Sequence, residues 1–155
     1  MCIRDRVKDV LAAGGEIAFW RVRMKPGRPL AFGHLAALAD GTRLPVLGMP
    51  GNPVSAMVSF EVFAAPAIRA LLGAAEVLPV TREAILLDGV AHKDDRRHFV
   101  RVRLEERDGL TVARLTGPQG SGILSSMVNA DALAILPEEA ASIEPGTRVE
   151  VIPLR

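Results

Sequence analysis

The feature that most constrains the fold is an apolar stretch at residues 54–72, which directly follows a glycine- and proline-rich turn at residues 48–53. Asn52 is suited to the N-cap of a helix, and Pro53 is suited to its first position. Gly73 is suited to the end of a helix. The turn and the stretch therefore predict one long helix.

This predicted helix is long enough to cross a membrane. However, Glu61 and Arg69 lie within it, and ionisable side chains are costly in the hydrocarbon core of a bilayer. Pro66 should kink the helix. We therefore expect a core helix and no membrane partner.

The residues before the turn predict strands. Residues 16–24, 30–35 and 44–47 are rich in β-forming side chains, and turn residues at 25–29 and 40–41 separate them. Strands that alternate with a helix indicate an α/β fold.

The first residues fit this scheme less well. Apolar spacing at residues 7–11 indicates the last turns of a helix, with glycine following. Residues 1–6 fit no element, and we expect them to be a leader that is not native to the fold.

The character of the sequence changes after Gly73. Residues 77–81 resemble a linker, and short strands follow. Residues 100–104 alternate between apolar side chains and arginine, which predicts a half-buried strand. A hairpin turn is expected at residues 108–109, and residues 145–146 precede a last strand. This half predicts a small β-barrel or sandwich.

Charge and cysteine content exclude several classes of site. The 19 basic and 18 acidic residues give a net charge of +1, so no general field attracts nucleic acid or an anionic membrane. Any anion site must be local.

The single cysteine, Cys2, rules out an internal disulfide, and a reducing, cytoplasmic setting fits. His34, His92 and His98 show no metal-ligand spacing and are interpreted as solvated, and residues 94–97 as a charged surface turn.

The first candidate site is the turn at residues 48–55. The first N–H groups of a helix have no partner inside it, and they point outward with the positive end of the helix dipole. That geometry suits phosphate or another oxyanion. Gly51 would let the backbone approach a ligand, and Ser55 could add a hydroxyl donor. The alternative is an ordinary strand-to-helix turn.

Two further candidates are weaker. On one strand, Arg21, Arg23 and Lys25 would share a face, and Arg28 flanks the next turn, so these cations could hold an anion or form a solvated basic edge. The glycine-rich residues 117–122 could surround a ligand or form an ordinary loop. We find no nucleophile–base pair of the kind that hydrolases need.

Several motifs together resemble the molybdopterin molybdenumtransferase family, whose eukaryotic relatives include the E domain of gephyrin. The Lys-Pro-Gly and Pro-Gly-Asn-Pro-Val-Ser motifs are the most specific part of the match, which is in order along the chain. The matching segments are residues 15–20, 24–33, 48–56, 97–101, 117–126 and 144–153.

The resemblance implies a fold and a function. Residues 7–74 would be the C-terminal half of a three-layer α/β molybdopterin-binding domain, incomplete at its N-terminus, and residues 78–155 a small β-barrel domain. Members of the family insert molybdate into adenylylated molybdopterin and release AMP, with a divalent cation such as Mg²⁺. They are homodimers whose site lies between domains of both subunits.

The resemblance also assigns roles to residues. Lys25 matches a lysine placed for the anionic substrate, and Arg21 and Arg28 stand where a bacterial member has lysine. Pro50 and Pro53 match prolines that line the site. The expected pocket would hold the molybdate or the phosphate of the pterin. The predicted substrate-binding residues are Arg21, Lys25, Arg28, Pro50, Gly51, Asn52, Pro53, Ser55 and Ser121.

One part of the family pattern has no match. The acidic residues and the threonine that the family uses lie upstream of the matching segments, so the catalytic residues are unknown and no metal ligand is predicted. We expect the isolated chain to lack transferase activity. The alternatives are a non-catalytic oxyanion-binding or scaffold module, and a general anion- or nucleotide-binding α/β protein.

Overall fold

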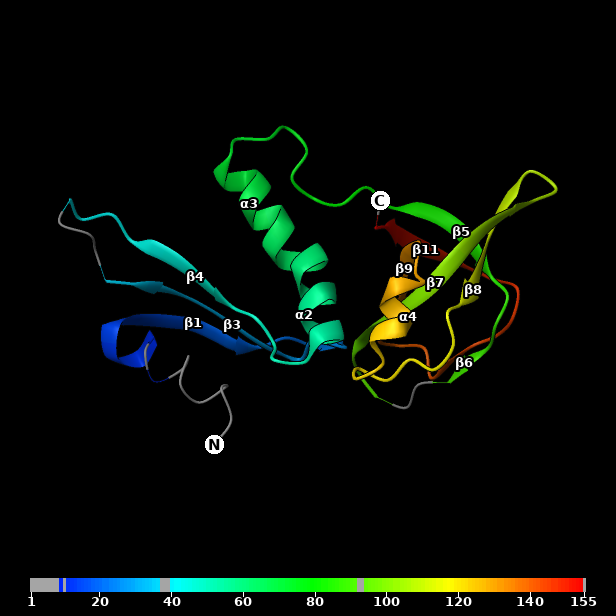
Figure 1. The fold of residues 1–155 in the computed structure, drawn as a ribbon, viewed down its shortest axis with the longest axis horizontal. Helices are drawn as coiled ribbons and strands as arrows, with labels where there is room; N and C mark the ends of the chain where they lie inside the picture. The colour runs from blue at the N-terminus through cyan, green and yellow to red at the C-terminus, as the bar shows by residue number, and fades with distance from the viewer. Residues whose placement is uncertain (1–8, 10, 37–39, 92–93, 155) are drawn as a thin grey trace.

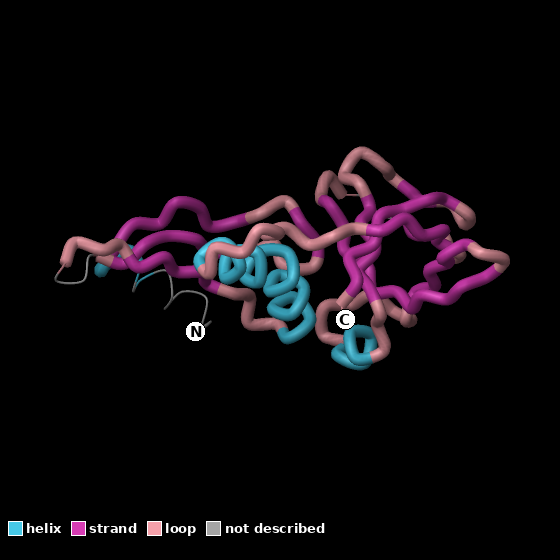
Figure 2. The backbone as a smooth tube through the Cα atoms, turned by 90° about the horizontal axis from the view of Figure 1, so that it is seen from above, coloured by secondary structure: helices cyan, strands magenta, loops and turns pink. Residues whose placement is uncertain are grey.

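The computed structural model describes residue 9 and residues 11–36, 40–91 and 94–154. A small sheet lies at one end of the molecule, a β-barrel at the other, and a helical segment between them (Figures 1 and 2). The predicted leader at residues 1–6 and most of the helix predicted at residues 7–11 lie outside the described residues. The predicted fold class, an α/β part followed by a small barrel, is confirmed.

The sheet at the first end has three antiparallel strands in the order β1-β3-β4. The strands predicted at residues 30–35 and 44–47 are therefore confirmed. The bounds are β1 (Gly15–Arg21), β3 (Pro29–Leu35) and β4 (Leu44–Gly48).

The strand predicted at residues 16–24 is wrong in its second part. The chain leaves the sheet after Arg21 and forms a separate short strand, β2 (Met24–Lys25). The N–H of Val22 donates to the carbonyl of Arg28 at 3.1 Å. The carbonyl of Arg23 accepts from the N–H of Arg97, far along the chain, at 3.0 Å. The basic side chains at positions 21, 23 and 25 therefore do not share the face of one continuous strand.

One helical segment follows the turn, as predicted. It comprises α2 (Pro53–Ser59), the π-helix η1 (Phe60–Ala64) and α3 (Ala65–Leu71). Pro66, which has no N–H to donate, lies in the first turn of α3, directly after the wider π turn. The segment ends at Gly73, whose φ is +71°. The N–H of Gly73 bonds to the carbonyl of Ala70, and the next N–H bonds to that of Arg69, which is a Schellman cap.

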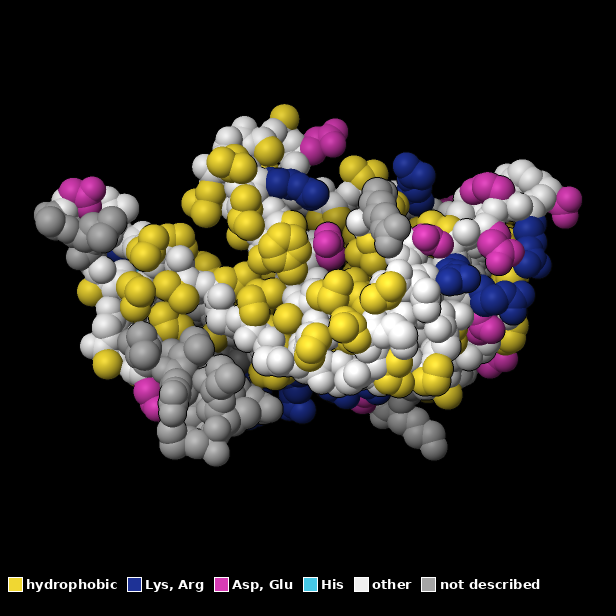
Figure 3. All heavy atoms as spheres, in the orientation of Figure 1, with side chains coloured by type: hydrophobic (Ala, Val, Ile, Leu, Met, Phe, Trp, Pro, Cys, Tyr) yellow, Lys and Arg dark blue, Asp and Glu magenta, His cyan; other side chains and the backbone are white. Residues whose placement is uncertain are grey.

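The prediction of a core helix holds for α2 and is wrong for α3. Val54 and Val58 of α2 are completely buried, whereas Ile68 and Leu71 of α3 are 48% and 73% exposed. By length and hydropathy alone the segment Pro53–Leu71 could also cross a membrane, and 28% of its most apolar window is buried. Apolar side chains gather on the visible face of this region in Figure 3, with charged side chains among them.

The second half forms a closed barrel, which excludes the sandwich alternative. Five strands of the larger sheet run in the order β7-β8-β5-β11-β9, and β9 pairs with β7 to close the ring. Asp108 and Gly109 both have positive φ, 51° and 76°, as a type I′ hairpin turn requires. The bounds are β5 (Arg82–Leu86), β7 (Arg97–Arg107), β8 (Leu110–Leu115), β9 (Ala132–Leu136) and β11 (Thr147–Pro153).

Short elements complete this half. The strands β6 and β10 pair with each other beside the barrel, and α4 follows the glycine-rich loop. Their bounds are β6 (Val90–Ala91), β10 (Ser142–Ile143) and α4 (Leu124–Val128).

A hydrophobic cluster joins the helical segment to the barrel and so fixes where the two halves meet. Its buried members come from β2, α2, β7, α4, β9 and β11. They are Met24, Val54, Val58, Phe99, Met127, Leu133 and Ile152.

Candidate functional site

A cavity of about 680 Å³ opens where the sheet, the start of α2 and the barrel meet. Its volume lies within the range of about 300–1,000 Å³ that is typical of small-molecule sites. It is lined by residues 24–29, 31, 48–52, 55, 96 and 119–121.

The cavity brings most of the predicted site residues together. Arg21 and Pro53 are the exceptions, since neither lines it. Arg21 is exposed at the end of β1, opposite Pro29, and Pro53 is exposed in the first turn of α2. The predicted residues that do line the cavity are Lys25, Arg28, Pro50, Gly51, Asn52, Ser55 and Ser121.

The loop that carries Lys25 and Arg28 is held against the helix at Gly27. Gly27 has a φ of +107°, which L-residues rarely adopt. A Cβ at this position would lie 2.6 Å from Oγ of Ser59 and 3.1 Å from Cε of Met24. The close approach therefore requires glycine, and it holds the loop with both cations against Ser59, the last residue of α2.

Asn52 occupies the predicted N-cap position, but its side chain makes no capping hydrogen bond. Its backbone is extended, with φ −79° and ψ 127°, and its carbonyl accepts from the N–H of Ala56 at 2.8 Å. Within the part of the chain that the structure describes, Oδ1 of Asn52 is buried without a partner. The cavity wall thus contains an unused hydrogen-bond acceptor.

Arg96 is a cation of the cavity that the sequence analysis missed. It lines the cavity, and the carboxylate of Asp94 accepts from its Nε and Nη2 at 3.1 and 2.6 Å. Oδ1 of Asp94, which accepts from Nε of Arg96, also contacts Nε2 of His98 at 2.9 Å. His98 is 5% exposed, so its interpretation as solvated is wrong. His98 is the second residue of β7 and lies opposite Lys25 in the pairing of β2 with β7.

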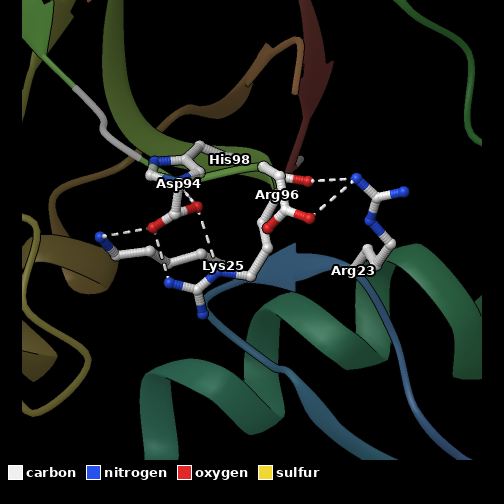
Figure 4. Close-up of polar contacts among 6 residues, drawn as sticks. Arg23, Lys25, Asp94, Arg96 and His98 are labelled. Atoms are coloured by element: carbon white, nitrogen blue, oxygen red, sulfur yellow. Dashed lines mark hydrogen bonds and ion pairs between the residues drawn. The ribbon is translucent and has the colours of Figure 1, made fainter. Parts of the chain in front are cut away.

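Asp94 also contacts Lys25, with 3.7 Å between Oδ2 and Nζ. Figure 4 shows Lys25, Arg96 and His98 converging on this carboxylate, with Arg23 to one side. The hydrogen bond from Arg96 holds the pKa of Asp94 well below its ordinary value, and the same contact raises the pKa of Arg96. The interpretation of residues 94–97 as a charged surface turn therefore missed that Asp94 and Arg96 pair at the cavity.

Arg101 is a second residue that the sequence pattern misjudged. The alternation at residues 100–104 predicts one exposed face, but Arg101 is 1% exposed, and burial lowers its pKa. Its guanidinium donates to Oγ of Ser126 at 3.1 Å and to the carbonyl of Gly120 at 3.3 Å. Among the described residues it has no carboxylate partner.

The glycine-rich loop is fixed to the same strand by Gln119. Its Oε1 accepts from the N–H of Arg101 at 2.8 Å, and its Nε2 donates to the carbonyls of Arg101 and Gly117 at 3.1 and 2.9 Å. These bonds place Ser121 at the cavity. The segment is therefore a fixed wall of the cavity.

The structure offers no ligand set for a metal ion within residues 11–36, 40–91 and 94–154. No group of three or more His, Cys, Asp or Glu side chains in these ranges could hold one. The cavity wall instead presents Lys25, Arg28 and Arg96 together with hydroxyl and amide groups, which is a donor set for an anion.

Two protein families match the two halves of the chain. Residues 3–70 match the family described as the probable molybdopterin binding domain. Residues 83–154 match the family described as the MoeA C-terminal region (domain IV).

Individual relatives match almost the whole chain. Molybdopterin molybdenumtransferase 2 of Mycobacterium tuberculosis is 34% identical over 94% of the chain, and gephyrin of Dictyostelium discoideum is 33% identical over 96%. The chain spans 35% and 23% of their lengths.

Solved structures agree. A molybdopterin biosynthesis MoeA protein from Pyrococcus horikoshii matches with a TM-score of 0.76 and 29% identity, over 97% of this chain and 35% of that one. A molybdenum cofactor biosynthesis protein from Pyrococcus furiosus matches with a TM-score of 0.71 and 29% identity, over 97% and 53%. The chain therefore belongs to the MoeA family of molybdopterin molybdenumtransferases.

Proposed function

We propose that the cavity binds a tetrahedral oxyanion, and that molybdate is the anion it serves. The observation that carries this proposal is the convergence of Lys25, Arg28 and Arg96 on one cavity, beside the hydroxyl-bearing residues Ser55 and Ser121. The whole chain has a net charge of only +1, so this concentration of positive charge is local.

The side chains suit such an anion in different ways. The guanidinium groups of Arg28 and Arg96 can each donate two parallel hydrogen bonds to an oxyanion, while the ammonium of Lys25 acts as a compact point charge. The first N–H groups of α2, which have no partner inside the helix, add donors at Ser55.

The size of the cavity supports a second, larger ligand. A volume of about 680 Å³ exceeds what one tetrahedral oxyanion fills, since a water molecule takes about 30 Å³ of liquid. A pterin carries amino and ring N–H groups. The unpartnered Oδ1 of Asn52 is an acceptor of the kind these donors need.

We propose that the complete protein inserts molybdate into adenylylated molybdopterin and releases AMP. The name of the Mycobacterium relative, molybdopterin molybdenumtransferase, supports this reaction. A cytoplasmic homodimer that uses Mg²⁺ is part of the same proposal. Because the described residues contain no group that fits a metal ion, we assign no step to Mg²⁺ in this chain.

Calorimetric titration of the 155-residue chain with sodium molybdate tests the proposed ligand. We expect saturable binding to one site, weakened by added salt because the contacts are ionic. Nitrate, a planar monoanion, is the matched comparison and should bind at least tenfold more weakly. Equal affinity for both anions, or no saturable molybdate binding, would exclude a site built for a tetrahedral oxyanion.

A further inference from the structure

The carboxylate of Asp94 is the common partner of three side chains around the cavity. Arg96 donates to it through Nε and Nη2 at 3.1 and 2.6 Å, Lys25 lies 3.7 Å away, and Nε2 of His98 lies 2.9 Å away. Two of these partners, Lys25 and Arg96, also line the cavity, whereas Asp94 does not. The carboxylate thus contacts two cations of the cavity without lining the cavity itself.

We propose that Asp94 is a positioning residue for the oxyanion site, and that it holds Lys25 and Arg96 in the orientation in which they receive the anion. This inference rests on the proposed function of the cavity. It assigns a role to a carboxylate that does not itself line the cavity.

The geometry at Arg96 supports this role. An arginine side chain has five N–H donors, and the pair with Asp94 uses those at Nε and Nη2. The remaining donors stay available, while the planar fork can no longer rotate freely. The Arg96 side chain is 25% exposed, so it is accessible from the cavity and also restrained by its surroundings.

The contact with His98 anchors Asp94 to the barrel. His98 is 5% exposed at the start of β7, where it lies opposite Lys25 in the parallel pairing of β2 with β7. The carboxylate therefore links a buried ring of one half of the molecule to a cation of the other half. This link fixes the distance between Lys25 and Arg96, which come from segments about 70 residues apart.

The neighbouring acidic residue shows what an ordinary surface pair looks like. Asp95 pairs with Arg23 at 3.1 Å, but both side chains are more than 70% exposed, and neither lines the cavity. Exposed pairs of this kind contribute little, because solvent and salt screen them. The Asp94 side chain is 28% exposed and has three partners.

A competing effect points in the opposite direction. Removing the negative charge of Asp94 would make the cavity more positive, and electrostatics alone would then tighten anion binding. A positioning role predicts weaker binding, because Lys25 and Arg96 would have to be ordered by the anion itself. The sign of the change in affinity therefore separates the two roles.

The test compares Asp94→Asn with Asp95→Asn, which removes the same charge one residue away. We expect Asp94→Asn to weaken molybdate binding about tenfold, because removing a group that orients a ligand-binding side chain typically costs about 10–100-fold in affinity. Asp95→Asn should change the affinity less than twofold. Asp94→Glu, which keeps the carboxylate, should recover part of the loss. Thermal melting of each variant confirms that it is folded.

A second measurement does not depend on the ligand. In ¹⁵N spectra the Nε–H of Arg96 should exchange slowly with solvent in the wild type and in Asp95→Asn, and at least tenfold faster in Asp94→Asn.

If wild-type chain binds no molybdate, the oxyanion site and this role are both excluded. If wild type binds and Asp94→Asn binds equally well or more tightly, the role of Asp94 alone is excluded.

Discussion

Replacing Gly27 by alanine should destabilise the chain and weaken its cavity at the same time. The turn at Gly27 has a φ of +107° and approaches the helix so closely that a Cβ would lie 2.6 Å from Oγ of Ser59. Lys25 and Arg28 lie on either side of this turn, so any shift of the backbone moves two cations of the proposed site.

The expected magnitude has two parts. A non-glycine residue in such a sparsely populated backbone region costs about 1–3 kcal/mol. Overpacking of a filled site adds about 1–3 kcal/mol, since Ser59 is completely buried and Cε of Met24 would lie 3.1 Å from the new Cβ. Gly27→Ala should therefore lower the free energy of unfolding by about 2–6 kcal/mol.

Urea denaturation with a double-mutant cycle separates the two parts. Ser59→Ala removes the hydroxyl that clashes, and this hydroxyl has no hydrogen-bond partner among the described residues. The double variant should recover about 1–3 kcal/mol of the loss but keep the cost of the positive φ. Gly51→Ala is the control, because nothing lies within 4 Å of its Cβ position, and it should stay within about 0.5 kcal/mol.

Molybdate titration of the same variants links stability to the site. Gly27→Ala should weaken binding even where the protein is folded, and Ser59→Ala should not. A Gly27→Ala variant as stable as the wild type would show that the turn can relax without cost. The argument for an obligatory glycine would then be refuted.

Three further predictions concern packing, the glycine-rich loop and pH. In urea denaturation, Val58→Ala should lower the free energy of unfolding by about 2 kcal/mol, because it removes two buried methyl groups at about 0.8 kcal/mol each and leaves a cavity. Met57→Ala, on the exposed side of α2, should lower it by about 0.5 kcal/mol or less. Equal effects of the two variants would contradict the assigned faces of the helix. Gln119→Ala removes three hydrogen bonds and should speed amide exchange at Ser121 at least tenfold, whereas unchanged exchange would mean that the loop is held by other contacts. The pKa of Asp94 is lower in the folded chain than in the unfolded chain. The ionised carboxylate therefore stabilises the folded chain fully above about pH 5, and this contribution is lost as the pH falls below about 4. Asp94→Asn should flatten this acid limb of the plot of stability against pH, and an unchanged limb would contradict the pairing of Asp94.

The sequence predicted those elements whose backbone geometry depends only on residues adjacent in the chain. Gly73 ends α3 and residues 108–109 form the hairpin turn because both require positive φ, which few residues accept. The turn at residues 48–53 and the Lys25 loop were likewise visible as motifs, and both line the cavity.

The remaining part of the site depends on contacts between distant segments. Arg96 and His98 are placed by the pairing of β2 with β7, which no local pattern reveals. Arg101 alternates with apolar residues as an exposed side chain would, but the loop at residues 117–122 covers that face of the strand. Period-2 patterns show which side chains share a face, and they do not show whether another segment covers it.

The measurement that tests the central claim most directly is the affinity of the Lys25→Ala variant for molybdate. Arg43→Ala is the matched control, because it also removes one positive charge but lies in an exposed pair with Glu16, away from the cavity. A cavity that binds a tetrahedral oxyanion through Lys25 predicts at least a tenfold loss for Lys25→Ala, about 1.4 kcal/mol, and less than a twofold change for Arg43→Ala. Equal affinity of Lys25→Ala and the wild type would contradict it.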